Sequence, residues 1–261
     1  GSFSPSFNPE TKTYYVTLPT EESYVNIKAE PNHPENTITS GVGEFNISSG
    51  TSTHNIVLTS KIGLVEVYKV EFYRPPSSYP YLKDIKIDDV SIEGFSSTKL
   101  NYNVNVPYNS DEIDINAIAG RGSQQIFGDG KISLKSGENK IVITVISEDG
   151  NSTIDYVLNI NRAHSSRLKI LTAEGTELNP EFDPETLTYS VDIMSTQLAL
   201  NLEVIPYDEE ATYTLKGFGY IKNSQTGTIT VTEPNSQTTE YKINIHKDGA
   251  PAITNWTYGY T

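Results

Sequence analysis

The fold of this chain is decided by the stretch FDPETLTYSV at residues 182–191, which has two further copies. The others read FNPETKTYYV at residues 7–16 and FSSTKLNYNV at residues 95–104. In each copy a tyrosine follows a phenylalanine by seven positions, which gives the pairs Phe7 and Tyr14, Phe95 and Tyr102, and Phe182 and Tyr189. Because the copies begin 88 and 87 residues apart, we predict a tandem array of one repeated unit.

A second marker has nearly the same period. Each repeat ends in a segment of alternating apolar and polar residues: YKVEF at 68–72, YVLNI at 156–160 and YKINI at 241–245. The leading tyrosines are 88 and 85 residues apart, at Tyr68, Tyr156 and Tyr241. A basic residue or histidine follows at Arg74, Arg162 and His246. The two markers together predict that these segments are equivalent terminal strands.

The pattern inside a repeat is typical of strands. Apolar and polar residues alternate in NYNVNV at residues 101–106, which gives a strand one buried and one exposed face. About seven such segments per repeat, with turns between them, predict an all-β chain of Ig-like sandwiches. We expect β-sandwich repeats at 1–74, 81–162 and 167–247. The linkers are short, and one is rich in proline at 75–80, so we expect an elongated rod.

The repeats resemble the bacterial cadherin-like β-sandwich domain of cell-surface proteins. The third copy carries the most residues of that family's pattern: Leu168, Leu178, Pro180, Phe182, Pro184, Tyr189, Val191, Tyr241, Ile243 and Ile245. The second copy departs from the pattern, with Glu93 and Ser97 in place of prolines. The resemblance implies spacer or adhesion modules at a bacterial cell surface, and it implies no catalytic residues.

The first strand of the repeat is displaced at the two ends of the chain. The second and third repeats open with an apolar strand at Leu82 and at Leu168, and the first repeat lacks it. The tail at 251–261 falls where a fourth repeat would begin, and its apolar positions are Ile253, Trp256, Tyr258 and Tyr260. One interpretation is a fragment cut out of step with its repeats. The other is donation of residues 252–261 to the first repeat of another copy, giving a head-to-tail homopolymer.

Composition limits the partners. The formal net charge of −14 repels phosphate backbones, so we expect no nucleic-acid binding. No apolar stretch reaches membrane-spanning length. The chain has no cysteine and is rich in asparagine, lysine, isoleucine and tyrosine, which favours a surface protein of a Gram-positive bacterium.

Sequence motifs for catalysis and metal binding are missing. The four histidines are scattered, and neither zinc-ligand spacing nor a nucleophile elbow occurs, so we expect no enzyme and no cofactor. Acidic turns such as Asp88-Asp89 could attract calcium, but turn chemistry explains them without an ion. We therefore expect a non-catalytic extracellular stalk, spacer or fibre subunit. The alternative is an adhesion or carbohydrate-binding module that recognises a host or cell-wall glycan or protein. Six of the 17 tyrosines fall at repeated positions, which indicates core residues rather than a sugar site.

Overall fold

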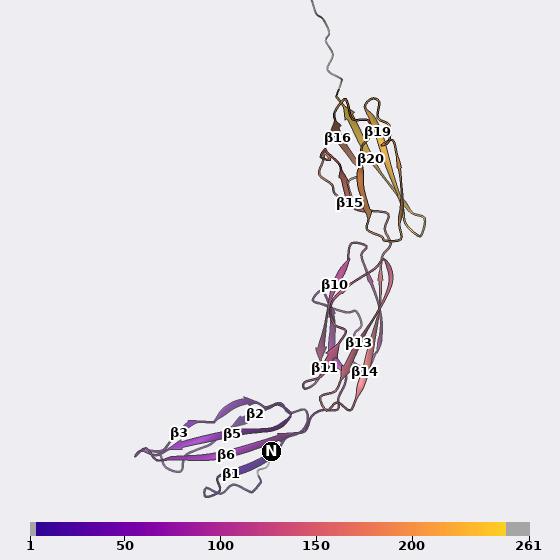
Figure 1. Cartoon of the computed structure of the whole chain (residues 1–261). Helices are drawn as coiled ribbons and strands as arrows, with labels where there is room; N and C mark the ends of the chain where they lie inside the picture. The colour runs from indigo at the N-terminus through magenta and orange to yellow at the C-terminus, as the bar shows by residue number, and fades with distance from the viewer. Residues whose placement is uncertain (1–3, 249–261) are drawn as a thin grey trace, which may run out of the picture. The chain divides into compact units, whose positions relative to one another are not determined.

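The computed structural model describes residues 4–248 and consists of strands and connecting loops (Figure 1). Twenty strands and no helix occur among these residues. Within the same residues there is accordingly no helix long and apolar enough to cross a membrane. The predicted all-β class with tandem sandwich units is confirmed.

The first sandwich contains β1–β6. Their bounds are Thr13–Thr17, Tyr24–Ile27, Thr37–Ser40, Gly43–Asn46, Gly50–Thr59 and Val65–Arg74. One sheet has the order β1-β6-β5-β3, and the other pairs β2 with β4. Strand β1 runs parallel to β6, with Tyr14 opposite Val70.

The second sandwich contains β7–β14. Their bounds are Leu82–Ile87, Val90–Ser91, Asn101–Val106, Glu112–Ala119, Gln125–Phe127, Gly130–Ser133, Gly137–Ile146 and Thr153–Arg162. The sheet orders are β12-β10-β7-β8 and β11-β13-β14-β9. The opening strand β7 pairs antiparallel with β10.

The third sandwich contains β15–β20. Their bounds are Leu168–Ala173, Thr188–Ile193, Leu202–Pro206, Thr212–Lys216, Gln225–Thr232 and Thr238–Lys247. One sheet has the order β16-β20-β19-β18, and β15 pairs with β17. Strand β16 runs parallel to β20, with Tyr189 opposite Ile243, as Tyr14 lies opposite Val70 in the first sandwich.

The described chain divides into two compact units. The first contains residues 4–102, 114–132 and 141–158, and the second contains 103–113, 133–140 and 159–248. The first sandwich lies wholly in the first unit and the third wholly in the second.

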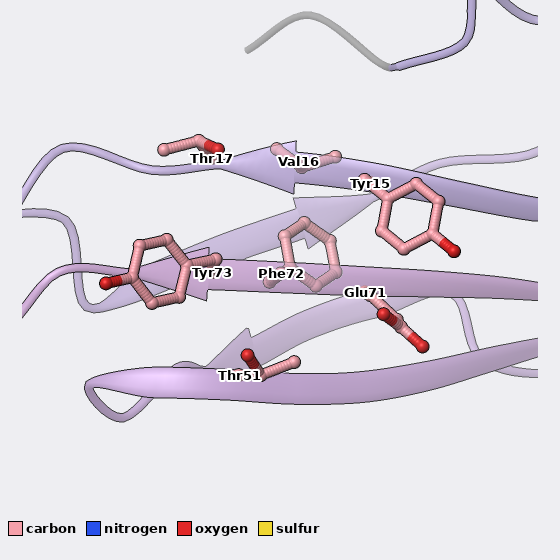
Figure 2. Close-up of a pocket in the computed structure, with 7 residues that line it drawn as sticks. All are labelled: Tyr15, Val16, Thr17, Thr51, Glu71, Phe72 and Tyr73. Atoms are coloured by element: carbon pink, nitrogen blue, oxygen red, sulfur yellow. The ribbon is translucent and has the colours of Figure 1, made fainter.

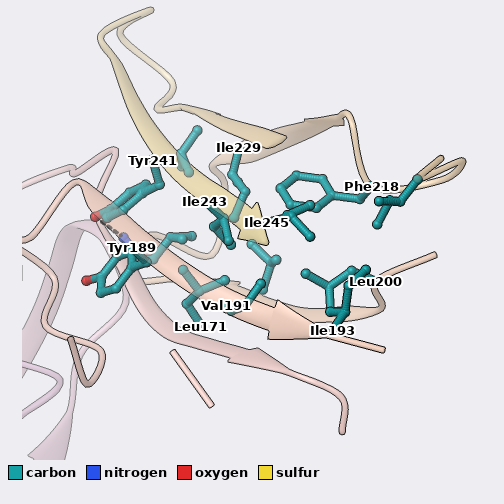
Figure 3. Close-up of a cluster of buried hydrophobic side chains, with 14 residues drawn as sticks. Leu171, Tyr189, Val191, Ile193, Leu200, Phe218, Ile229, Tyr241, Ile243 and Ile245 are labelled. Carbon is teal, nitrogen blue, oxygen red and sulfur yellow. Dashed lines mark hydrogen bonds between the residues drawn. The ribbon is translucent and has the colours of Figure 1, made fainter. Parts of the chain in front are cut away.

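Each core follows from the alternation of side chains along the strands. In β20, Tyr241, Ile243 and Ile245 are buried, whereas Lys242 and His246 are exposed. They join a cluster in the third sandwich that also contains Leu171, Val191 and Ile229 (Figure 3). The first sandwich has a smaller cluster: Val16, Leu18, Ile47, Val70 and Phe72.

Candidate functional site

The first repeated tyrosine closes a loop in every sandwich. The hydroxyl of Tyr14 donates to the carbonyl of Asn8 at 2.5 Å and accepts the N–H of the same residue. Tyr102 makes the same two bonds to Ser96, and Tyr189 makes them to Asp183. These are the contacts of a tyrosine corner, in which the hydroxyl fixes a loop a few residues upstream.

The predicted phenylalanines pack on these tyrosines. The ring centroids of Phe7 and Tyr14 are 5.8 Å apart, and those of Phe95 and Tyr102 are 5.9 Å apart. Phe182 lies 6.0 Å from Tyr189. Phe7 differs from its counterparts because 66% of its surface is exposed, whereas Phe95 and Phe182 are half-buried.

The second repeated tyrosine binds the next residue of the same loop. The hydroxyl of Tyr68 donates to Pro9, that of Tyr156 to Ser97 and that of Tyr241 to Pro184. Tyr156 and Tyr241 also accept the backbone N–H of the residue that opens the first strand, at 3.0 and 3.1 Å respectively. Figure 3 shows this bond for Tyr241. These donors are Leu82 and Leu168.

Tyr68 accepts from a different donor. Its hydroxyl takes a hydrogen bond from the ammonium of Lys12 at 3.1 Å, where Tyr156 and Tyr241 accept from the first strand. Tyr68 is half-buried, whereas Tyr156 and Tyr241 are fully buried. Within residues 4–248, β2 pairs with β4 alone, whereas its counterpart β10 lies between β12 and β7. Among the strands of residues 4–248, the second edge of β2 is therefore open.

A buried arginine lies at the end of β6. Arg74 donates to the carbonyl of Thr20 at 2.7 Å, within its own sandwich. Its guanidinium also binds both carboxylate oxygens of Glu148, at 2.6 and 3.1 Å. Glu148 comes from the β13–β14 hairpin of the second sandwich, in the same compact unit. Both side chains are 4% exposed, so this is a buried, bidentate ion pair.

The loops around Glu148 donate hydrogen bonds to its carboxylate and leave space for it. Burial alone would raise the pKa of Glu148, but hydrogen bonds from Arg74 and from the N–H of Ser77 lower it from 4.5 to about 2. Gly122 has a φ of +59°, and a Cβ there would lie 2.6 Å from the Glu148 carboxylate. Glycine is therefore required at this turn.

Arg162 occupies the equivalent place at the end of β14. It donates to three backbone carbonyls, those of Tyr108, Leu134 and Tyr207. It also lies 3.0 Å from a carboxylate oxygen of Asp111 and 3.2 Å from one of Glu209. Glu209 belongs to the third sandwich, in the same compact unit as Arg162. The arginine that ends each of these sandwiches is thus bound by a carboxylate of the next.

Further polar contacts surround Arg162. His164 Nδ1 lies 2.7 Å from the buried carboxylate of Asp208. The hydroxyl of Tyr108 donates to Glu185 at 2.7 Å, and this bond raises the pKa of Tyr108 to about 12.

We call the contacts of Arg74 with Glu148 the first joint and those of Arg162 with Glu209 the second joint.

The cation that ends the third sandwich is Lys247, and the assignment of this place to His246 was wrong. Lys247 follows Tyr241 by six positions, as Arg74 follows Tyr68. Its ammonium donates to the carbonyls of Gln197 and Ile221, each at 2.7 Å. His246 lies one position earlier and therefore on the exposed face of β20. Counting from the tyrosine would have identified Lys247 from sequence.

A shallow hollow lies on the outer face of the β1-β6-β5-β3 sheet (Figure 2). It is lined by the exposed residues Tyr15 and Thr17 from β1, Tyr73 from β6 and Thr51 from β5, and by the half-buried Glu71 from β6. Tyr15 is 53% exposed and Tyr73 is 47% exposed. Neither belongs to the repeated tyrosines, so the interpretation of tyrosines as core residues does not extend to them.

The predicted strand-donor tail and the metal ligands that the sequence left open can be compared with the described residues. The tail residues Ile253, Trp256, Tyr258 and Tyr260 lie outside the described residues. Residues 4–248 contain no group of three or more histidine and acidic side chains arranged to hold a metal ion.

Comparison with known proteins identifies one part of the chain. Residues 82–163 match the family model described as a cadherin-like beta sandwich domain. No curated protein matches the sequence. Among solved structures, protocadherin gamma B7 extracellular cadherin domains 1–4 matches with 10% identity and a TM-score of 0.26, covering 89% of this chain and 74% of that one. Drosophila N-cadherin EC1-4 matches with 9% identity and a TM-score of 0.22, covering 95% and 75%. TM-scores this low support no further conclusion, whereas the family match does: residues 82–163, the second sandwich, are a cadherin-like β-sandwich domain.

Proposed function

We propose that this chain is a non-catalytic spacer of a bacterial cell-surface protein, in which sandwich repeats ending at residues 74, 162 and 247 set distance and stiffness. The observation that carries the proposal is the repeated joint. Arg74 and Arg162 each bind carbonyls of their own sandwich and a carboxylate of the next. At the first joint the pair is buried and bidentate, which fixes direction as well as distance, so it resists bending at that linker.

Small-angle scattering of the purified chain tests this function. A compact globule of this length has a radius of gyration of about 18 Å. Three sandwiches in a row exceed about 100 Å in length, which corresponds to about 30 Å for a thin rod. We expect the larger value and a narrow distance distribution. The double variant Arg74→Met and Arg162→Met should broaden that distribution. A globular profile for the unmodified chain would refute the spacer function.

We further propose that residues 252–261 act as a strand donor to the first sandwich of another copy, which builds a head-to-tail fibre. Three observations support an acceptor there. In the part of the chain that the structure describes, β2 has a paired strand on one edge only, the Tyr68 hydroxyl accepts from Lys12 instead of a strand N–H, and Phe7 is exposed. In the sequence, Ile253 follows Leu168 by 85 residues, close to the repeat period, which aligns it with the residues whose N–H binds Tyr156 and Tyr241.

Deletion of residues 252–261 tests the strand donor. Light scattering over a concentration series should show assembly of the full chain and a monomer for the truncated one. The matched variant Ile253→Asp should abolish assembly without shortening the chain. If the full chain stays monomeric at all concentrations, the fibre is excluded while the spacer function stands.

The second candidate function is recognition of a glycan. The exposed pair Tyr15 and Tyr73 favours it, because this pair occurs in one sandwich only.

A further inference from the structure

The outer face of the first sandwich differs from the same face of the other two. Tyr15 pairs with Glu71 across β1 and β6, and Thr17 pairs with Tyr73. The matching pairs of the third sandwich are Ser190 with Asn244 and Asp192 with His246. In the second sandwich these places hold two asparagine pairs, whose side chains bond at 3.0 and 3.3 Å: Asn103 with Asn159, and Asn105 with Asn161. The second and third sandwiches thus hold polar pairs without tyrosine at these positions, so the fold does not require tyrosine there.

The exposure of the two rings argues against a purely structural role. The repeated tyrosines Tyr14 and Tyr189 are 3% and 1% exposed and use their hydroxyls inside the fold. Tyr15 and Tyr73 leave about half of their surface in water. Their backbone is held by the sheet, and at Tyr15 by a further antiparallel bridge to Ser4. The rings therefore stand on a rigid base, which limits the entropy lost on binding.

The spacing suits a ligand with successive rings. Tyr15 and Tyr73 lie on adjacent strands and are offset by two residues. Strand spacing and rise then place their Cα atoms about 8 Å apart along a diagonal of the sheet. Glu71 and Thr51 supply polar oxygens beside the rings (Figure 2). Aromatic faces that bind apolar ring surfaces, next to oxygens that bind hydroxyls, form a platform for a carbohydrate.

The charge of the chain and the depth of the hollow limit the class of ligand that could bind. The Glu71 carboxylate is paired with the ammonium of Lys69, so the charge beside Tyr15 and Tyr73 is locally neutralised. The chain as a whole has a net charge of −14. A polyanionic glycan would be repelled by that net charge. The hollow has a cavity volume of about 90 Å³, which is too small to enclose a ligand. The ligand must therefore lie along the surface.

From these observations we propose that Tyr15 and Tyr73 form the binding platform for a neutral oligosaccharide. This inference deepens the second candidate function and rests on it. It does not depend on the spacer or on the fibre, which are tested by scattering and by tail deletion.

Binding of the full chain to immobilised neutral hexasaccharides tests the platform. The probes are cellohexaose, chitohexaose, laminarihexaose and mannohexaose, with heparin as the anionic comparison. We expect binding to at least one neutral probe with a micromolar to millimolar dissociation constant and none to heparin. Tyr15→Ala and Tyr73→Ala should each weaken that binding about tenfold.

Tyr213→Ala is the matched control, because Tyr213 is an exposed strand tyrosine of the third sandwich, at 44%. It should leave binding unchanged. The radius of gyration and circular dichroism of all variants should equal those of the parent chain, which separates lost binding from lost folding. The platform is excluded by an absence of neutral binders, by undiminished binding in the Tyr15 and Tyr73 variants, or by an equal loss in Tyr213→Ala. It is also excluded if the two variants abolish self-association instead, since the face would then be a protein interface.

Discussion

The first and third sandwiches use the same scaffold and differ in how completely it is covered. Both pair the tyrosine-bearing strand parallel to the last strand, and both close the same loop with two tyrosine hydroxyls. The core cluster of the third sandwich has fourteen buried residues, whereas that of the first has five among the described residues. The difference follows from β15, which lies beside β17 and has no counterpart beside β2 within residues 4–248.

This contrast separates what the repeat requires from what each copy can vary. The tyrosine loop persists without the covering strand, because Lys12 replaces the backbone donor to Tyr68. The outer sheet face is free to vary, since it contributes nothing to the core. The inside of the sandwich therefore carries the spacer role, and the outside is where recognition can differ between repeats.

The most direct way to break the comparison is to remove one core side chain from each sandwich. Ile229 lies opposite Tyr241, and Ile56 lies opposite Tyr68, so the two residues are matched in type and register. Ile229 is fully buried and Ile56 is half-buried. We expect Ile229→Ala to lower the local free energy of unfolding by about 4 kcal/mol and Ile56→Ala by about 2 kcal/mol. Hydrogen exchange followed by mass spectrometry resolves each sandwich. Equal losses would mean that the first core is as well covered as the third.

Replacing the cations that end the first and third sandwiches, Arg74 and Lys247, gives the next largest expected change in the free energy of unfolding. Arg74→Met leaves Glu148 buried without its partner and should destabilise the first joint by about 3 kcal/mol. Lys247→Met should cost about 1 kcal/mol, since Lys247 is half-buried and its carbonyl partners can turn to water. Urea titrations monitored by hydrogen exchange in β6 and β20 measure both. The double variant Arg74→Met and Glu148→Leu should recover most of the loss. No recovery would show that Arg74 acts through packing rather than charge.

Acid should weaken the two joints unequally. The pKa of Glu148 is about 2 in the folded chain and 4.5 ordinarily, so its stabilising effect is complete above pH 4.5 and is lost as the pH falls towards 2. Hydrogen bonds also lower the pKa of Glu209 to about 2, against burial that would raise it. Its side chain is 55% exposed, however, so solvent screens its contribution.

We therefore expect the free energy of unfolding of the first joint to decrease more than that of the second between pH 4.5 and pH 2, by up to about 2 kcal/mol. A lower urea midpoint measures this decrease. The variant Glu148→Gln should lower the midpoint at neutral pH and flatten its acid dependence. A flat profile in the unmodified chain would contradict the depressed pKa of Glu148.

The features that repeat could be predicted from the sequence, because residues that the fold requires recur at the same positions in all three copies. The all-β class and the sandwich units followed from alternation and period. The partners of Arg74 and Arg162 could not be predicted, since Glu148 and Glu209 lie in loops whose approach depends on tertiary structure. The repeat does not identify Tyr15 and Tyr73, because neither occupies a repeated tyrosine position. The signal for them is the failure of the pattern to repeat on the exposed face.

The smallest expected effect gives the sharpest comparison of the two sandwiches. Tyr241→Phe removes the acceptor of the buried Leu168 N–H and the donor to Pro184, so we expect a loss of about 1.5 kcal/mol in the third sandwich. Tyr68→Phe should cost less than about 0.5 kcal/mol, since Lys12 and Pro9 can bond to water instead.

Chain concentration then links this pair of variants to the fibre. If residues 252–261 of another copy fill the open position beside β2, their backbone should replace Lys12 as the donor to Tyr68. The loss caused by Tyr68→Phe should then rise towards that of Tyr241→Phe at concentrations where the chain assembles, and stay small in dilute solution. Hydrogen exchange at two concentrations measures this change. A loss in Tyr68→Phe that is independent of concentration, in a chain that does assemble, would mean that assembly uses another surface.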